Sequence, residues 1–183
     1  EGAAKSRNKG IFQAEGKFIA FLDSDDLWHH EKLTKQINFM RQKKVHFSYT
    51  NYSYIDSHGR HIRNSSCPAE ISYQSLLRDC SIGCLTVIYS TDFFGKIYNP
   101  EIRARNDYGT WLRLAKKSNG YLLDVNLAKH RIHPGTLSSS KLKMILYYYL
   151  LFYKYEKLGF NKSILYTISN LFIKIKIRLN HIF

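Results

Sequence analysis

Hydrophobic residues follow two different spacings over the first two thirds of the chain. Short apolar runs, such as residues 18–22, are typical of buried strands. Between these runs, apolar residues recur at every third or fourth position, as at Tyr108, Trp111 and Leu112, which is typical of a helix with one buried face. Helices and strands that alternate along a chain predict an α/β fold.

The same pattern places the individual elements. Helices are expected at residues 3–14, 71–77 and 107–117, with a further helix that has Leu33, Ile37 and Met40 on its buried face. Strands are expected at residues 17–22, 45–49, 84–89 and 121–125, the last followed by residues 127–133 and a polar loop at 134–140. Residues 51–63 are expected to form a hairpin that turns at residues 57–60.

Residues 141–183 differ because their apolar residues follow only the helical period. Gly159 separates two stripes, which are Leu142, Ile145, Leu146, Tyr149, Phe152 and Tyr153, then Ile164, Ile168, Leu171, Ile175, Leu179 and Ile182. Basic residues dominate the charges of this segment. We therefore divide the chain into an α/β domain, residues 1–140, and a basic amphipathic helical tail, residues 141–183. Such a tail either lies on an anionic membrane surface or packs on the α/β domain or a partner subunit.

The chain has 183 residues, of which 44% are hydrophobic, so it can bury a core. Its formal net charge of +14 suggests an anionic partner: nucleic acid, the phosphates of a nucleotide, or an anionic membrane surface. Cys67, Cys80 and Cys84 form no CxxC pattern, which is typical of reduced thiols in the cytoplasm. The longest apolar stretch, residues 144–153, is shorter than the roughly 20 residues that cross a bilayer. We expect a cytoplasmic protein, peripheral on the inner face of the plasma membrane.

Three aspartates, Asp23, Asp25 and Asp26, directly follow the strand expected at residues 17–22. In open α/β sheets this edge binds ligands. Carboxylates so close together repel one another unless a cation or strong hydrogen-bond donors offset their charge. A Mg²⁺ or Mn²⁺ ion that also binds a substrate diphosphate would meet this need. The alternative is that Asp25 or Asp26 caps the next helix, which leaves the other aspartates unexplained.

The residues around these aspartates resemble family 2 glycosyltransferases, which have the Rossmann-like GT-A fold. The resemblance runs over residues 2–141 and is carried by Ser6-Arg7-Asn8-Lys9-Gly10, by residues 14–28 with Asp23-Ser24-Asp25 near their end, and by Lys32, Leu33 and Gln36. The similar enzymes assemble bacterial cell-surface polysaccharides, including those of the teichuronic-acid type.

The resemblance implies a role for each matching residue. Asp23 would contact the ribose or the sugar of a nucleotide-sugar donor, Asp25 would bind the metal ion, and Asp26 would cap the following helix. Arg7 and Asn8 would lie beside the nucleotide; the alternative for both is a solvated helix face.

A second similar segment is residues 105–114, in which Asp107 precedes an aromatic helix. In the family this aspartate is the general base, which takes the proton of the acceptor hydroxyl as the new bond forms. Asn106 replaces the acid that often precedes it. Asp107 is also expected to cap its helix, whose N-terminus favours a negative charge.

A third similar segment is residues 130–138, where a histidine of GT-A enzymes can complete the metal or diphosphate site. His133 fits that position, and His130 stands where an aromatic residue is usual. The alternative for an isolated histidine such as His133 is a structural role. His29 and His30 are expected to be exposed residues at the start of a helix.

These residues imply an inverting glycosyltransferase that uses Mg²⁺ or Mn²⁺ to move a sugar from a nucleotide-diphospho-sugar to a hydroxyl of a cell-envelope glycan or lipid-linked acceptor. The family begins with strands that hold the base and ribose. None precedes Glu1, so we expect a GT-A domain that lacks its first strands. Two alternatives stay open: an inactive fragment of such an enzyme, and a basic nucleic-acid-binding module. Nucleic acid is not the expected partner, because the aromatic residues lie on apolar stripes rather than among the basic clusters.

Overall fold

The computed structural model describes residues 2–133 and 141–179, and its elements alternate as an α/β fold should. Its strands are β1 (Phe18–Ala20), β2 (Leu27–Trp28), β3 (Phe47–Ile55), β4 (His61–Asn64), β5 (Glu70–Ile71), β6 (Ile88–Ser90) and β7 (Gly120–Arg131). Its helices are α1 (Ala3–Gln13), α2 (Lys32–Lys43), α3 (Tyr73–Arg78), α4 (Thr91–Phe94), α5 (Asn106–Ala115), α6 (Lys141–Leu150) and α7 (Phe160–Leu179), with a 3₁₀ turn η1 (Cys84–Thr86) and a π-helical turn η3 (Leu151–Tyr155).

The strands form one mixed sheet in the order β1-β6-β3-β7-β2, with β4 beside β3 and β5 beside β7. Strand β6 is antiparallel to both β1 and β3, whereas β3 is parallel to β7. Strands β1, β3 and β7 therefore run in the same direction and end at the same edge of the sheet. Asp23 follows β1 at this edge, and His130 lies near the end of β7.

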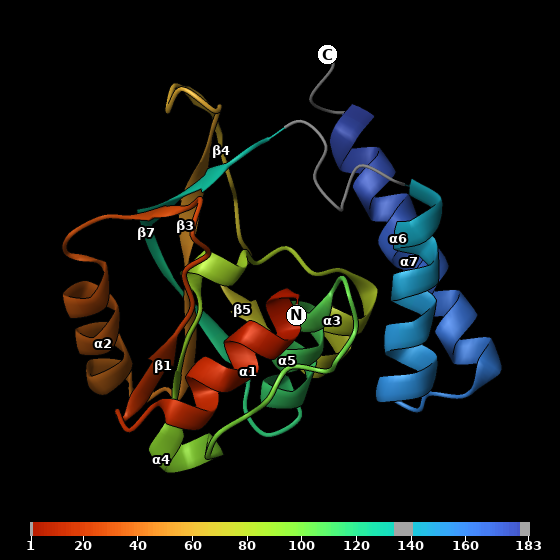
Figure 1. Ribbon diagram of the computed structural model, residues 1–183, viewed down its shortest axis with the longest axis horizontal. Helices are drawn as coiled ribbons and strands as arrows, with labels where there is room; N and C mark the ends of the chain where they lie inside the picture. The colour runs from red at the N-terminus through yellow and green to blue at the C-terminus, as the bar shows by residue number, and fades with distance from the viewer. Residues whose placement is uncertain (1, 134–140, 180–183) are drawn as a thin grey trace.

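Helices cover both faces of the sheet. Figure 1 shows α2 on one side, α1, α3 and α5 on the other, and α6 and α7 beyond them. The outer layer is in contact with the inner one, because α7 contacts α3 as well as α6. Among the helices of the described residues, none has the length and apolar character needed to cross a membrane.

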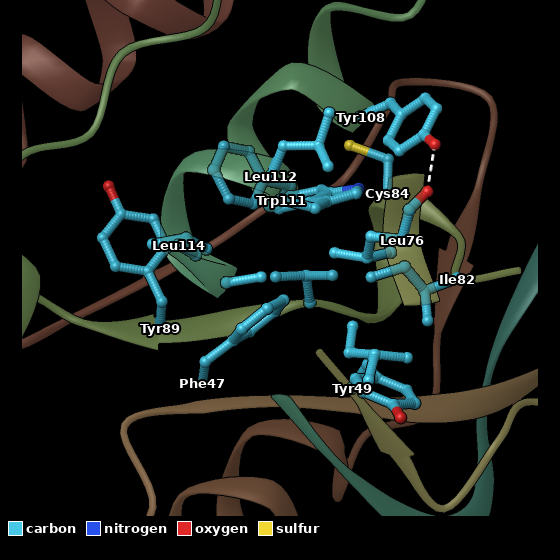
Figure 2. Close-up of a cluster of buried hydrophobic side chains, with 14 of the residues drawn as sticks. Phe47, Tyr49, Leu76, Ile82, Cys84, Tyr89, Tyr108, Trp111, Leu112 and Leu114 are labelled. Atoms are coloured by element: carbon cyan, nitrogen blue, oxygen red, sulfur yellow. Dashed lines mark hydrogen bonds between the residues drawn. The ribbon is translucent and has the colours of Figure 1, made fainter. Parts of the chain in front are cut away.

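The core lies between the sheet and α5. Figure 2 shows Trp111 and Leu112 of α5 near Phe47 and Tyr49 of β3, and all four side chains are fully buried. Phe21, just after β1, meets Trp111 edge to face, with ring centroids 5.2 Å apart. Burying each large apolar side chain contributes about 1.5–3 kcal/mol. This packing fixes the position of α5 relative to the end of β1, which is where the predicted chemistry begins.

The buried face of α2 differs from the expected one. Lys32, Gln36 and Met40 are buried, whereas Leu33 is 42% exposed and Ile37 is only partly buried. Met40 is thus buried as expected, but Lys32 and Gln36 take the inward positions that were expected for Leu33 and Ile37.

Hydrogen bonds explain why these polar side chains can be buried. Lys32 Nζ donates to Gln36 Oε1 at 2.8 Å and lies 4.6 Å from the ring centroid of Trp28. Gln36 Nε2 in turn donates to the carbonyl oxygen of Thr86 at 2.9 Å and to Ser48 Oγ at 3.0 Å. A buried polar network is tolerated when its members find partners. Burial nevertheless disfavours the charged amine and lowers the pKa of Lys32 to about 7.

Strand pairing sets several boundaries that periodicity did not predict. Residues 84–89 begin as η1 and only then become β6. Residues 120–131 form one continuous strand, β7, because it pairs along β3 through two register shifts. Between Asp26 and α2 the chain adds β2, which pairs with β7. The expected hairpin is confirmed by the antiparallel pairing of β3 with β4.

The tail forms two helices separated at Gly159, as predicted, and Gly159 has a positive φ of 79° that favours glycine. The inner side of α6 and η3 buries Tyr148, Leu151 and Phe152. Gly109 of α5 allows this close approach, because a Cβ atom there would lie 3.0 Å from Leu151 Cδ1.

Within the described residues, most side chains of the two predicted stripes are exposed. Phe152 is buried and Leu171 packs partly buried against the core, whereas Ile182 lies outside the described residues. Leu142, Leu146 and Ile168 are 80%, 53% and 59% exposed. The residues that α7 buries are instead polar, namely Ser163, Thr167 and Asn170. Up to residue 174, the fully buried side chains of α7 are therefore polar, and Tyr166 and Leu171 pack beside them partly buried. Its large exposed side chains on the outward face are apolar, unlike those of an ordinary surface helix.

Candidate active site

A cleft of about 590 Å³ opens at the edge where β1, β3 and β7 end. Its acidic side chains are Asp23, Asp26 and Asp107, and its basic side chains are Arg63, Arg105, His130 and Lys174. The cleft therefore joins the aspartates that follow β1 with the aspartate at the start of α5. Lys174 comes from α7, so the tail also lines the cleft.

Asp23 is held by an ion pair in which one guanidinium nitrogen of Arg7 bonds to both carboxylate oxygens. Arg7 Nη2 donates to the two carboxylate oxygens of Asp23 at 2.5 and 2.7 Å. Arg7 Nη1 also donates to Asn106 Oδ1 at 2.6 Å. Arg7 thus links the end of β1 to the first turn of α5, and charge-assisted pairs of this geometry are among the stronger hydrogen bonds.

Asp25 and His133 approach each other beside the cleft. The distance between Asp25 Oδ2 and His133 Nε2 is 3.6 Å, and the two side chains are 46% and 38% exposed. Arg131 Nε donates to the backbone oxygen of Asp25 at 3.0 Å, which steadies this loop against β7. A carboxylate and an imidazole at this separation suit a divalent ion such as Mn²⁺, and two protein ligands leave positions for a diphosphate. The residues present therefore fit the expected ion.

Asp26 does not cap the following helix, so that expectation is wrong. Its carboxylate is 2% exposed, lies 3.0 Å from His130 Nδ1 and accepts a hydrogen bond from the Arg131 backbone nitrogen at 2.9 Å. The first residue flanking α2 is Glu31, which makes no capping bond with its side chain. The hydrogen bond from Asp26 favours the charged imidazole and raises the pKa of His130. This Asp26–His130 pair in the cleft was not predicted.

Asp107 is the second residue of α5, and it too does not cap the helix. The cap position belongs to Arg105, which has a positive φ of 63° and makes no capping bond with its side chain. Within the part of the chain that the structure describes, the Asp107 carboxylate forms no hydrogen bond or ion pair. It faces the cleft and is partly exposed, so it is available to a ligand. An unpaired carboxylate in a cleft is what a general base requires.

Asn8 is tied to the loop that precedes α5. Its Oδ1 accepts a hydrogen bond from the Asn99 backbone nitrogen at 2.7 Å, and its Nδ2 donates to the Asn99 carbonyl oxygen at 3.0 Å. Asn8 lines a separate pocket with Phe12 and Glu101 rather than the 590 Å³ cleft. Its visible role is to fix the loop, and a contact with a nucleotide stays a prediction.

His29 and His30 are exposed just before α2, as expected. With Glu31 they form a compact group whose ligand atoms lie within 4.8 Å of one another. Glu31 is already paired with Lys35 at 2.7 Å, and the group is outside the cleft. We assign it no role in the chemistry.

Two of the three free cysteines, Cys80 and Cys84, line the cleft. Burial raises the pKa of Cys80 to about 12 and raises the pKa of Cys84 well above its ordinary value. Both therefore stay neutral thiols at neutral pH, which makes them poor nucleophiles and poor metal ligands.

Comparison with known proteins decides the family. A family model described as glycosyl transferase family 2 matches residues 1–100, which is more than half of the chain. A glycosyltransferase of Haemophilus influenzae is 34% identical over 181 residues, which cover 96% of this chain and 72% of that protein. The chain belongs to glycosyltransferase family 2. The resemblance drawn from residues 2–141 is thereby confirmed.

Other relatives show which family 2 glycosyltransferases are similar. TuaG of Bacillus subtilis, assigned to teichuronic acid biosynthesis, is 38% identical over 88% of this chain. WfaP of Escherichia coli, a UDP-Glc:alpha-D-GlcNAc-diphosphoundecaprenol beta-1,3-glucosyltransferase, is 39% identical over 80% of this chain. The chain spans 65% and 58% of these two proteins, which is less than two thirds of each.

A solved structure supports the fold. Residues 1–349 of S. aureus TarS in complex with UDP-GlcNAc superpose with a TM-score of 0.60 at 21% identity. The match covers 85% of this chain and 48% of the TarS chain. The mixed α/β sheet of this family 2 glycosyltransferase is therefore of the GT-A kind.

Proposed function

We propose that this chain carries the catalytic centre of an inverting glycosyltransferase that moves a sugar from a nucleotide-diphospho-sugar to a hydroxyl of a cell-envelope glycan or lipid-linked acceptor. One observation carries this proposal: the unpaired Asp107 carboxylate lines the same cleft as Asp23. The relatives support the substrate classes, because WfaP is named for UDP-Glc and a diphosphoundecaprenol-linked sugar, and TarS was solved with UDP-GlcNAc.

The donor would bind at the end of β1. Asp23, oriented by Arg7, would accept hydrogen bonds from the ribose or the donor sugar. Asp25 and His133 would hold a Mg²⁺ or Mn²⁺ ion. When bound, such an ion neutralises the diphosphate and makes it a better leaving group. In this proposal Arg7 and Asn8 mainly position other groups beside the nucleotide. Arg7 orients Asp23, and Asn8 fixes the loop before α5.

The transfer itself would be a single displacement. The acceptor oxygen forms a bond to the anomeric carbon on the face opposite the diphosphate. The bond from that carbon to the phosphate oxygen breaks, and its electron pair leaves with the nucleoside diphosphate. Asp107 takes the proton that the acceptor hydroxyl loses. Attack from the opposite face inverts the anomeric configuration. Because the sugar is never bonded to the protein, the reaction needs one carboxylate as a base and no second carboxylate as a nucleophile.

The proposal predicts binding that depends on a divalent ion. UDP-Glc and UDP-GlcNAc are titrated into the chain by calorimetry with Mn²⁺ and with EDTA, and UDP release is followed in parallel. We expect binding with Mn²⁺ and a much lower affinity in EDTA. If no nucleotide sugar of a wider panel binds to the folded chain with Mn²⁺, the proposal is wrong. Binding without UDP release would favour the inactive-fragment alternative.

We also propose that residues 141–183 attach the protein to the cytoplasmic face of a membrane, while residues 1–140 carry the chemistry. The outward face of α7 is apolar, with Leu165, Ile168 and Phe172 at 61%, 59% and 68% exposure. Exposed lysines of the tail are Lys143, Lys154, Lys157 and Lys162. Apolar residues that enter the headgroup region, combined with lysines that attract anionic lipid, describe an interfacial helix.

Flotation with anionic liposomes tests this attachment. We expect the chain to float at low salt and less at high salt, since each lysine near an anionic surface contributes about 1 kcal/mol that salt screens. The double variant Leu165→Ser/Phe172→Ser should float poorly, because it removes apolar side chains that would enter the headgroup region. It should still fold, because both side chains are exposed. Phe12→Ser is the matched control, since Phe12 is 70% exposed on α1. A wild-type chain that does not float at low salt, or a double variant that floats as well as the control, contradicts the attachment.

A further inference from the structure

Arg105 is a cation that lines the cleft. Its guanidinium lies 4.6 Å from the ring centroid of Tyr148, which belongs to α6. Among the described residues it makes no hydrogen bond or ion pair, and its Nε is buried without a partner. Stacking on a ring fixes the plane of a guanidinium while its other N–H groups stay available to a planar or tetrahedral anion.

Lys174 is the second cation at this end of the cleft. Its Nζ lies 2.8 Å from Asp79 Oδ1 and donates to the backbone oxygen of Cys80 at 2.9 Å. The side chain is 37% exposed and lines the cleft. The tail therefore supplies Lys174 directly, and it positions Arg105 through Tyr148.

These cations line the same cleft as Asp107. Arg105 precedes α5 by one residue and is two positions from Asp107. Lys174 bonds to the backbone of Cys80, which also lines the cleft. The donor proposal uses neither cation.

We propose that Arg105 and Lys174 bind the phosphate or diphosphate group of a lipid-linked acceptor. This inference rests on the proposed function, in which Asp107 takes a proton from the acceptor hydroxyl. An acceptor sugar that carries a phosphate on its anomeric carbon has that anion only one sugar ring away from its reacting hydroxyl. A cationic subsite in the same cleft as the base is where such an anion would lie. Lys174 belongs to α7, whose outward face is proposed to touch the membrane, and Tyr148, on which Arg105 stacks, belongs to α6.

Inorganic pyrophosphate is the probe, titrated by calorimetry in EDTA so that no divalent ion can recruit it to Asp25. We expect binding to the wild-type chain and an affinity about 10- to 100-fold weaker in Arg105→Gln, since hydrogen bonds to charged groups are of that strength. Arg113→Gln is the matched control. It removes the same charge from α5, but its guanidinium bonds to the Tyr98 carbonyl oxygen outside the cleft.

Two substitutions with opposite expected effects on pyrophosphate affinity test the role of Lys174. Lys174→Gln should weaken pyrophosphate binding, and Asp79→Asn should strengthen it, because it removes the carboxylate that competes for the amine. If Lys174 only ties α7 to the end of α3, both variants lower the melting temperature and neither changes pyrophosphate affinity. That result would overturn the role of Lys174.

Three outcomes would overturn the subsite as a whole. One is a wild-type chain that does not bind pyrophosphate in EDTA. Another is equal affinity in Arg105→Gln and Arg113→Gln. The third is that Arg105→Gln lowers the affinity for UDP with Mn²⁺ as much as it lowers the affinity for pyrophosphate. That result would mean that Arg105 binds the donor instead of the acceptor. Failure of the proposed function is a separate result, because it appears as missing Mn²⁺-dependent binding of nucleotide sugars whatever pyrophosphate does.

Discussion

Asp107→Asn should leave donor binding nearly unchanged and slow transfer by about 10²- to 10⁴-fold, the range expected when a general base is lost. The amide keeps the shape of the side chain but cannot take the proton of the acceptor hydroxyl. Donor binding should survive because Asp107 forms no hydrogen bond or ion pair within the described residues, whereas the donor is proposed to bind through Asp23 and Asp25. Initial rates of sugar transfer and calorimetric titration of UDP with Mn²⁺ measure the two effects.

Asp92→Asn provides the control for the charge itself. Asp92 lies in the first turn of α4, as Asp107 lies in the first turn of α5, but it is exposed and outside the cleft. Either substitution removes a favourable interaction with a helix N-terminus that is worth about 0.3–1 kcal/mol. Both variants should therefore stay folded, and only Asp107→Asn should lose transfer. Wild-type rates in Asp107→Asn would mean that another group takes the proton.

Asp25→Asn should abolish the part of donor affinity that depends on a divalent ion. A neutral amide is a far weaker ligand for a hard cation than a carboxylate. The affinity for UDP in EDTA should not change, because the substitution adds no bulk at an exposed position. Titrations of UDP with Mn²⁺ and with EDTA give the difference directly.

The same titrations of UDP with Mn²⁺ and with EDTA test His133 through the variant His133→Gln. If both residues hold the ion, this variant should also lower the Mn²⁺-dependent affinity, although less, because it removes no negative charge. Asp92→Asn again controls for a change of net charge. Mn²⁺-dependent affinity that stays at the wild-type value in Asp25→Asn would rule out Asp25 as a metal ligand, whatever His133→Gln shows.

Sequence reasoning predicted the site best where the signal was local. The apolar run before Asp23 predicted a buried strand, and its sharp change to acidic residues predicted a strand end with ligand-binding groups. The helical spacing of Tyr108, Trp111 and Leu112 likewise predicted α5, on which Asp107 lies. In each case a few neighbouring residues contain the whole pattern.

Long-range pairing was not predictable in this way. His130 and Asp26 are 104 residues apart in sequence, and they meet because β2 pairs with β7. Nothing near either residue encodes that register. A helix capped by Asp26 was therefore a reasonable prediction that the added strand made wrong.

The spacing of apolar residues along a helix also does not determine which of its faces is buried. In α2 the inward residues Lys32 and Gln36 count as polar, yet they are satisfied by hydrogen bonds inside the protein. In α7 the period was correct, but Ser163 and Thr167 face inward because the small polar face fits against α3 and α6. Periodicity reports that a helix has two different faces, whereas tertiary contacts decide their orientation.

The buried amine of Lys32 couples folding to proton release. An unfolded lysine has a pKa of about 10.4, so it holds its proton at neutral pH, whereas burial lowers the pKa of Lys32 in the folded chain to about 7. Since the unfolded state binds more protons between these two values, the free energy of unfolding rises with pH across that window and is flat below it. Buried tyrosines such as Tyr49, whose pKa burial raises, have the opposite effect once the pH exceeds about 10. The combined contribution of Lys32 and Tyr49 to the free energy of unfolding is therefore greatest at about pH 10.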